Sequence, residues 1–584
     1  MSQDSATAAA PSEPIPEPSP FFQACHKGDA DTVKALLREL DLEVNQVDND
    51  GCTGLMAAAL AESLETVDLL LQDARVQLNV ADNEGDSAFM IACATGNLAI
   101  VQRFLQEPTL DINHTNSRGM SGFVVACMVG RQEIVNLLKD EPKLNPQHLS
   151  MGLYFAGVGG QVAILDILLA LPTVDVNLSD PMHGNTALIT ASQFGHKDAV
   201  ARLLAEPMVQ VNHKNKYGGT AFTSACDKGH SDVVALLMDH PEFDKDGMSE
   251  GFLPAVANGH EALVKTLLAF PTVNVNHSIQ PHETTVHLTA LTLAASSGYV
   301  GIVKELLQRE TIQVNPTDAS FASPLVQASY NGHLDVVSLL LAHPGLDVNQ
   351  TNDFENNALY AAVAHNHVDV ALRLLECADL DIHHVNQAGQ NAFMIAACLD
   401  QVAVVEKILA KDGAGFDINA SDADGKTALL LACAKGATQT LPLVLAHSKT
   451  DVNQADKNGS TALLIACATG NATVLQQLLA SDRIDVNMES GDASTVLFGA
   501  ALNGATDMIK LLLEDARLDV NPKDKRGNTA LMAACHTNRA DVVGLLLTHP
   551  SIDTKATNTE GKTALEIATS NYFQNVVDVL VAHR

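Results

Sequence analysis

The sequence predicts an all-α repeat solenoid, in which antiparallel helix pairs are stacked and joined by short β-turn fingers. Two observations lead to this fold class. One motif of about 34 residues recurs from one end of the 584-residue chain to the other. Each copy carries two short apolar stripes at helical spacing, which a lone helix pair could not bury. The copies must therefore stack on one another.

The copy between Asn453 and Asn487 shows the unit most clearly. It reads NQADKNGSTALLIACATGNATVLQQLLASDRIDVN. The run DKNG is typical of a tight turn, after which Thr461 can cap a helix by accepting a hydrogen bond from a free backbone N–H. Gly470 can end that helix in the left-handed conformation. A second helix then follows, with an apolar stripe through Val474 and Leu478.

The asparagine that closes each copy gives the period, which is most often 34 residues. We expect this anchor side chain to shape the turn through hydrogen bonds. The anchors are Asn45, Asn79, Asn113, Asn145, Asn177, Asn212, Lys245, Asn276, Asn315, Asn349, His383, Asn419, Asn453, Asn487, Asn521 and Lys555. Together with a leading helix pair at residues 21–40, they predict 17 helix pairs.

The unit resembles the ankyrin repeat, a turn followed by two antiparallel helices with a period near 33 residues. The resemblance covers about residues 21–584 and rests on many weak copies rather than on one strong motif. The family's T-P-L-H opening reads T-A-L-x here, and its proline is kept only at Pro324. The family histidine is replaced by residues such as Met56, Met90, Tyr154, Leu464 and Phe498. We expect apolar contacts in place of the family's Thr–His hydrogen bonds.

The chain is strongly acidic, with 35 Lys and Arg against 69 Asp and Glu and a net charge of −34. Such a surface repels phosphate backbones and anionic lipids, so nucleic acid and membrane surfaces are disfavoured as partners. Two interpretations of the charge remain. Acidic turns can keep a long apolar stack in solution, or they can attract protein partners with basic surfaces. No apolar run of about 18 residues occurs, so we expect no membrane insertion.

Seven of the ten cysteines occupy the same place on the first helix of their repeats. Copies one repeat apart are separated by about 8–10 Å, which exceeds the roughly 7 Å that a disulfide spans between Cα atoms. We therefore expect these cysteines to form no disulfides and to pack as small buried apolar residues. This indicates a reducing compartment, the cytoplasm or alternatively the nucleus. These cysteines are Cys25, Cys93, Cys127, Cys226, Cys433, Cys467 and Cys535.

Irregularities in the middle of the chain set the predicted divisions. Residues 1–20 read as a disordered tail rich in Pro, Ser and Ala, and residues 21–242 as regular repeats. Residues 243–290 combine a shortened turn after Lys245, Pro254 inside a helix and an overlong finger after Asn276. Residues 291–584 are again regular repeats and end in a cap. We expect a monomer.

The chain contains no recognisable catalytic, cofactor or metal motif. His277, His282, Glu283 and His287 lie in the long finger, but their spacing matches no standard zinc-ligand pair, and an exposed loop explains them better. The resemblance implies a non-enzymatic protein–protein interaction scaffold that binds on its concave side through finger tips and first helices. The alternatives are a dedicated inhibitor or targeting adaptor of a single enzyme, and an enzyme with a site in the irregular middle.

The finger tips supply the candidate binding residues. Most tips are small, polar and acidic, as at Asp48, Asp50, Asp82, Glu84, Asp422 and Asp424. Three carry an aromatic residue instead: Tyr217, Phe321 and Phe354. Exposed aromatics ringed by polar groups are favoured at interface hot spots, so we predict docking on repeats 7 to 11 around these rings. The alternative is that each ring packs back on its neighbouring finger.

Overall fold

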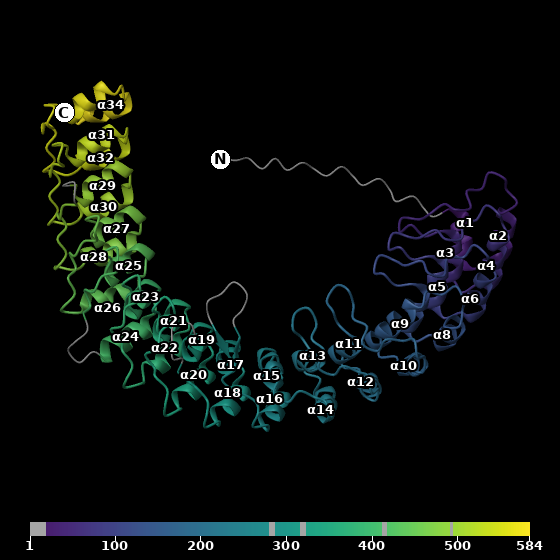
Figure 1. Ribbon diagram of the computed structural model, residues 1–584. Coiled ribbons are helices and arrows are strands. Elements are labelled where there is room, and N and C mark those ends of the chain that lie inside the picture. Colours follow the sequence, from purple (N-terminus) through teal and green to yellow (C-terminus); the bar gives the residue numbers. More distant parts are fainter. Residues whose placement is uncertain (1–18, 280–286, 316–322, 412–416, 491–493, 584) are drawn as a thin grey trace. The chain divides into compact units, whose positions relative to one another are not determined.

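A computed structural model describes residues 19–279, 287–315, 323–411, 417–490 and 494–583. Within these ranges the chain forms 34 helices and one two-stranded sheet, so the expected all-α architecture and its 17 helix pairs are confirmed. The chain divides into two compact units, residues 1–273 and 274–584. In Figure 1 the two helices of each pair lie side by side.

The first unit holds eight helix pairs, and the first helices of successive pairs contact one another. These first helices are α1 (Pro20–Lys27), α3 (Gly54–Leu60), α5 (Ala88–Thr95), α7 (Gly122–Val129), α9 (Gln147–Val158), α11 (Ala187–Gln193), α13 (Ala221–Lys228) and α15 (Met248–Ala257). The second helices are α2 (Ala30–Leu36), α4 (Leu64–Leu71), α6 (Leu98–Leu105), α8 (Gln132–Leu138), α10 (Val162–Leu169), α12 (Lys197–Leu204), α14 (Ser231–Asp239) and α16 (Glu261–Leu268).

The second unit begins with a short hairpin, β1 (Ser278–Ile279) and β2 (Leu288–Thr289), at the base of the long finger. Its first helices are α17 (Ala290–Ser297), α19 (Pro324–Tyr330), α21 (Ala358–Ala364), α23 (Ala392–Cys398), α25 (Ala428–Lys435), α27 (Ala462–Thr469), α29 (Val496–Asn503), α31 (Ala530–His536) and α33 (Ala564–Ser570). Its second helices are α18 (Val300–Leu307), α20 (Leu334–Leu341), α22 (Val368–Leu374), α24 (Val402–Lys411), α26 (Thr440–Ala446), α28 (Ala472–Leu479), α30 (Thr506–Leu513), α32 (Ala540–Leu547) and α34 (Gln574–Ala582).

The capping residues behave as the sequence predicts. The Thr461 hydroxyl accepts a hydrogen bond from the Leu464 N–H at the start of α27, and Gly470 ends that helix with φ 70°. Where the interhelical glycine is missing, another residue adopts the same left-handed conformation, as Glu62 does with φ 55°. The turn geometry is therefore imposed by the repeat even where the residue type does not favour it.

The anchor asparagines do more than shape their own turns. The Asn453 amide donates to the Arg483 carbonyl (2.9 Å) and accepts from the Asp485 N–H (2.8 Å), about 30 residues further along. An asparagine that makes both bonds thus joins the connecting segments of two consecutive repeats. Twelve asparagines make this pair of bonds: Asn45, Asn79, Asn113, Asn177, Asn212, Asn276, Asn315, Asn349, Asn419, Asn453, Asn487 and Asn521.

Two of the predicted anchors are wrong. The Asn145 N–H donates to Asn113 Oδ1, and its own Oδ1 accepts from the Gln147 N–H, which is the pattern that Asp111 makes two residues before Asn113. Asn145 therefore stands in the place of the preceding aspartate. The same comparison applies to Lys245. The Asp244 N–H donates to Asn212 Oδ1, and the Asp246 N–H donates to Asp244 Oδ1. Asp244 therefore stands in the place of the aspartate, and Asp246 rather than Lys245 occupies the anchor position.

This correction explains the two shortened turns. Helix α9 begins at Gln147 and α15 at Met248, almost directly after the connecting segment, so neither repeat has a finger. The residues that would form one extend the helix instead, to 12 residues in α9 and 10 in α15, whereas the other first helices have seven or eight. Pro254 lies inside α15, as expected.

The seven cysteines that share one position in their first helices are free and buried, as predicted. Several of them, with a phenylalanine four residues earlier, pack against a glycine of the next first helix. A Cβ atom at Gly152 would lie 2.7 Å from Cε1 of Phe123 and 2.9 Å from Sγ of Cys127. Burial raises the pKa of the Cys25 thiol to about 12, which agrees with a packing role rather than a reactive one.

Candidate protein-binding surface

In eleven of the fingers that the structure describes, one polar side chain builds the turn. Asp48 Oδ1 accepts hydrogen bonds from the N–H groups of Asp50 (3.0 Å) and Cys52 (2.8 Å), which closes the turn on itself. An Asp or Asn accepts from the residue two positions ahead in eleven fingers: Asp48, Asp82, Asn116, Asp180, Asn215, Asn352, Asn386, Asp422, Asp456, Asp524 and Asn558.

Neighbouring fingers are also joined through their backbones. The Asn83 N–H donates to the Asp50 carbonyl (2.9 Å), so the tip of one finger is fixed to the next. Equivalent bonds run from Ser117 to Glu84, Lys216 to His183, Gln387 to Phe354, Ala423 to Ala388, Lys457 to Asp424 and Thr559 to Arg526. These bonds join the fingers through main-chain atoms, so they do not depend on the side chain at the tip position.

The residue two positions after each turn-forming Asp or Asn is the tip residue. All eleven tip residues are exposed or half-buried: Asp50, Glu84, Arg118, Met182, Tyr217, Phe354, Ala388, Asp424, Asn458, Arg526 and Glu560. They include acidic, basic, aromatic and aliphatic side chains on one repeated backbone turn. Such a row presents different chemistry at regular positions.

The six acidic residues singled out in the sequence divide into two groups. Asp48, Asp82 and Asp422 are turn-forming residues whose carboxylates accept backbone hydrogen bonds. These bonds use hydrogen-bond acceptor positions of each carboxylate that a partner protein would otherwise contact. Asp50, Glu84 and Asp424 are exposed tip residues, although Glu84 pairs with Arg118 (3.3 Å) and Asp424 with Lys426 (3.4 Å).

The aromatic tips project from their fingers. Tyr217 is 78 % exposed and Phe354 67 %, in the first and second unit respectively. The Tyr217 ring lies 6.2 Å from the ring of His183 on the preceding finger, so it has a neighbour and still presents most of its surface to solvent. Phe321 lies outside the described residues, as do His282 and Glu283 of the long finger.

A cavity of about 620 Å³ occupies the place where the finger of α9 is missing. Its floor is formed by one side of α9, including Met151, Tyr154 and Phe155, and its walls by the two flanking fingers, through Arg118 and Met182. Cavities of roughly 300–1,000 Å³ with apolar walls and a few polar groups are typical of ligand pockets. We call this space the finger gap.

Two ionisable groups in the finger gap have shifted pKa values. Burial, together with the nearby Asp180 carboxylate, raises the pKa of the Tyr154 hydroxyl to about 12. Burial also opposes ionisation of Asp180, but backbone hydrogen bonds, chiefly from His183 and Asn185, outweigh it and lower the pKa of that carboxyl. Tyr154 is therefore a neutral hydroxyl and Asp180 a carboxylate occupied by its own turn.

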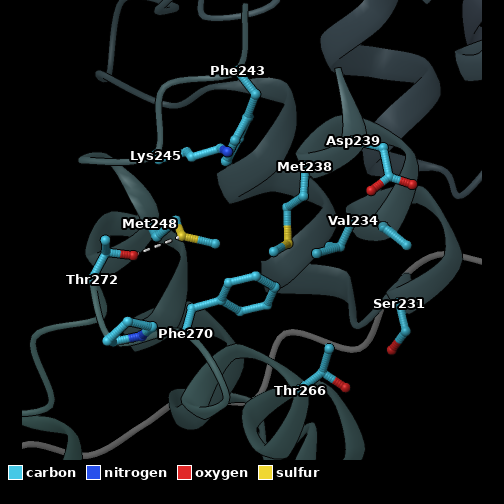
Figure 2. Close-up of a pocket in the computed structure, with 12 residues that line it drawn as sticks. Ser231, Val234, Met238, Asp239, Phe243, Lys245, Met248, Thr266, Phe270 and Thr272 are labelled. Carbon is cyan, nitrogen blue, oxygen red and sulfur yellow. Dashed lines mark hydrogen bonds between the residues drawn. The ribbon is translucent and has the colours of Figure 1, made fainter. Parts of the chain in front are cut away.

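A second cavity, of about 350 Å³, lies beside the other repeat that lacks a finger. Second helices α14 and α16 and the segment leading to α15 line it, so it is not part of the finger row. Figure 2 shows Met238, Met248 and Phe270 turned toward a common space, with the Thr272 hydroxyl hydrogen-bonded to Met248 Sδ (3.2 Å). Its lining is mainly apolar.

Among the residues that the structure describes, no group of three His, Cys, Asp or Glu side chains could hold a metal ion. In the same residues, no helix combines the length and apolar character required to cross a membrane.

Comparison with known families decides the identity of the fold. A model described as ankyrin repeats (three copies) matches residues 12–80, 153–248, 252–352, 325–422, 407–490 and 493–584, well over half of the chain. The chain belongs to the ankyrin repeat family. The resemblance inferred from the sequence is thereby confirmed. No curated protein sequence matches the chain significantly.

Solved ankyrin repeat structures resemble parts of the chain. The crystal structure of the ankyrin repeat domain of Bcl-3, a member of the IkappaB protein family, matches with 24% identity and a TM-score of 0.36, covering 39% of this chain and 98% of that one. The crystal structure of EF0377, an ankyrin repeat protein, matches with 25% identity and a TM-score of 0.31, covering 34% and 99%.

This ankyrin array uses histidine at a position that our sequence interpretation missed. A histidine directly after the interhelical residue places its Nε2 within hydrogen-bond distance of a carbonyl near the end of the preceding repeat's first helix. The pairs are His196 with Val158, His230 with Gln193, His260 with Asp227, His333 with Ser296 and His367 with Tyr330. Each histidine ring also packs against the interhelical glycine of the preceding repeat. For example, a Cβ atom at Gly332 would lie 2.3 Å from His367 Nδ1. The recurring Gly-His dipeptide is the signal in the sequence.

Proposed function

We propose that the chain is a non-enzymatic scaffold that binds partner proteins through its finger tips and the exposed ends of its first helices. Ankyrin repeats are protein–protein interaction modules. The observation that carries the proposal for this chain is the set of eleven tips, five in the first unit and six in the second, in which the backbone turn is constant and the side chain varies. In such a surface, the residue that forms the turn of a finger differs from the residue that contacts a partner protein.

The acidic tips of the proposed surface favour partners with basic patches. Asp50, Glu84, Asp424 and Glu560 carry exposed carboxylates, in a chain with a net charge of −34. Complementary charge raises association rates and rejects wrong partners more than it adds affinity. We place this activity in the cytoplasm of a monomeric protein.

Affinity capture with tip variants tests this proposal. Tyr217→Ala and Phe354→Ala remove exposed rings that make no fold-determining contact, so melting temperatures should stay near those of the parent protein. Removing an anchoring aromatic from an interface costs about 1–2 kcal/mol or more, which is roughly 5- to 30-fold in affinity. The amount of partner protein that each variant captures from extracts of cells expressing the protein should therefore decrease. Mass spectrometry quantifies this amount.

Two control variants change highly exposed residues that lie away from the fingers. Tyr572→Ala and Met208→Ala change residues that are 92 % and 77 % exposed, and partner recovery should be retained. Equal recovery with tip and control variants would place the binding surface elsewhere. A single partner at fixed stoichiometry would favour the inhibitor or adaptor alternative over a scaffold with many partners.

A further inference from the structure

The finger gap is a local departure from the repeat with a clear structural origin. Asn113 bridges to Lys143 and Asn145, and α9 then begins at Gln147 without an intervening turn. The fingers before and after α9 are consequently separated by an unfilled position. The cavity is thus a product of the fold rather than of side chains that happen to be small.

The surface exposed in the finger gap is apolar and rigid. Helix α9 has the sequence QHLSMGLYFAGV, which contains no Asp, Glu, Lys or Arg. The Tyr154 and Phe155 rings are 5.1 Å apart in an edge-to-face arrangement, which fixes the shape of the floor. Met182, at the tip of one wall, is 73 % exposed. Such a site gains most from a partner side chain that is bulky and apolar.

A basic residue, Arg118, lines the finger gap, although the chain as a whole is acidic. The Asp180 carboxylate accepts from the N–H groups of Met182 (3.0 Å), His183 (2.7 Å) and Asn185 (2.7 Å), and its side chain is only 13 % exposed. Arg118, on the opposite wall, is 67 % exposed and pairs with an equally exposed Glu84 at 3.3 Å. An exposed pair of this kind contributes little, so its guanidinium can exchange partners readily.

The same sign continues on the next finger. Lys214 and Lys216 precede Tyr217 on its finger. His183 lines both the finger gap and another cavity, of about 340 Å³, that Tyr217 also borders. Lys214 contacts Glu250 at 3.2 Å, and Lys216 donates to the Pro181 carbonyl. The finger that carries Met182 and His183 is therefore a ridge between two cavities, with basic residues on both sides.

We propose that the finger gap is a docking pocket for a partner peptide that inserts one bulky apolar side chain and carries adjacent carboxylates. The apolar side chain contacts Met151, Tyr154 and Met182, and the carboxylates pair with Arg118 and with the lysines beyond the ridge. This inference rests on the proposed scaffold function and assigns it one specific ligand class. It also predicts local recognition of acidic peptides by a protein that is acidic overall.

Selection from a random peptide library displayed on phage, with the full chain as bait, tests the pocket. Enriched peptides should share a bulky apolar residue next to Asp or Glu. Synthetic fluorescein-labelled copies should bind in fluorescence anisotropy, and replacing the apolar residue by alanine, or the acidic residues by lysine, should weaken binding at least about tenfold, equivalent to roughly 1.4 kcal/mol.

Matched variants locate the binding. Met182→Glu and Arg118→Glu should each lower the affinity for the labelled peptides at least about tenfold while leaving the melting curve of the protein unchanged. Met208→Glu replaces a similarly exposed methionine outside the gap, and Arg38→Glu replaces an exposed arginine that follows α2, away from the fingers. Both controls should bind the peptides as the parent protein does.

Several outcomes would overturn the proposal. Enriched peptides that all bind Met182→Glu and Arg118→Glu normally would refute the pocket, whatever their charge. Such peptides would leave the scaffold function standing if Tyr217→Ala or Phe354→Ala weakened them. Failure to enrich any peptide would refute the pocket and would also count against the scaffold.

Discussion

At the residue scale, a single Asp or Asn forms the turn in eleven of the described fingers. Its side chain accepts two backbone N–H groups in Asp48, Asp456 and Asn558 alike, so the turn forms without help from the side chain of the tip residue. The acidic character of the sequence is therefore of two kinds. Carboxylates such as that of Asp422 build turns, whereas those of Asp50 and Asp424 face solvent.

His148 supplies a prediction at the same scale. It is buried on α9, and its Nδ1 has no hydrogen-bond partner among the described residues. Burial lowers its pKa below the ordinary value of 6.5, against a smaller opposite effect of Asp111. The unfolded chain therefore binds the proton more readily, so the stabilisation from His148 is complete above about pH 6.5 and is lost as the pH falls below it.

The variant His148→Leu removes this titration. Thermal unfolding between about pH 7.5 and about pH 5 should show a smaller loss of stability for the variant than for the parent protein. His26→Leu, which replaces an exposed histidine of α1, serves as the control. An unchanged pH dependence in His148→Leu would show that other groups govern the acid response.

At the element scale, α9 and α15 are the informative departures. The shortened turns were visible in the sequence, but their consequence was not, because an Asn two residues early can pass for the anchor. Pro146 was the available signal, since proline suits the start of a helix and stands directly before Gln147. The finger gap could not be predicted, because it depends on the positions of two fingers that are far apart in the chain, one carrying Arg118 and the other Met182.

Glycines in the first helices give an element-scale prediction. Gly152→Ala would bring a methyl group within 2.7 Å of Phe123 and 2.9 Å of Cys127, so we expect a loss of about 1–3 kcal/mol despite the better helix propensity of alanine. A methyl group at Gly499, in α29, would meet no atom within 4 Å, so Gly499→Ala should gain about 0.5–1 kcal/mol. Urea unfolding followed by circular dichroism measures both, and equal effects would contradict the packing assignment.

At the scale of the whole molecule, repetition made the fold predictable. The 17 helix pairs and the buried cysteines followed from a pattern that recurs in nearly every copy. The residues that distinguish one repeat from another were harder to predict, because each occurs only once or a few times in the chain. Tyr217 and Phe354 were found as aromatic tips, while Met182 and Arg118 were missed because neither departs from ordinary turn composition.

Hydrogen–deuterium exchange on the full chain, with and without a partner recovered by affinity capture, tests the central claim most directly. Peptides that cover the fingers and the first helices, such as those containing Tyr217 and α13, should exchange more slowly in the complex. Peptides from second helices, such as α12 and α14, should be unchanged. Protection confined to the second helices would contradict the assignment of the finger row as the binding surface.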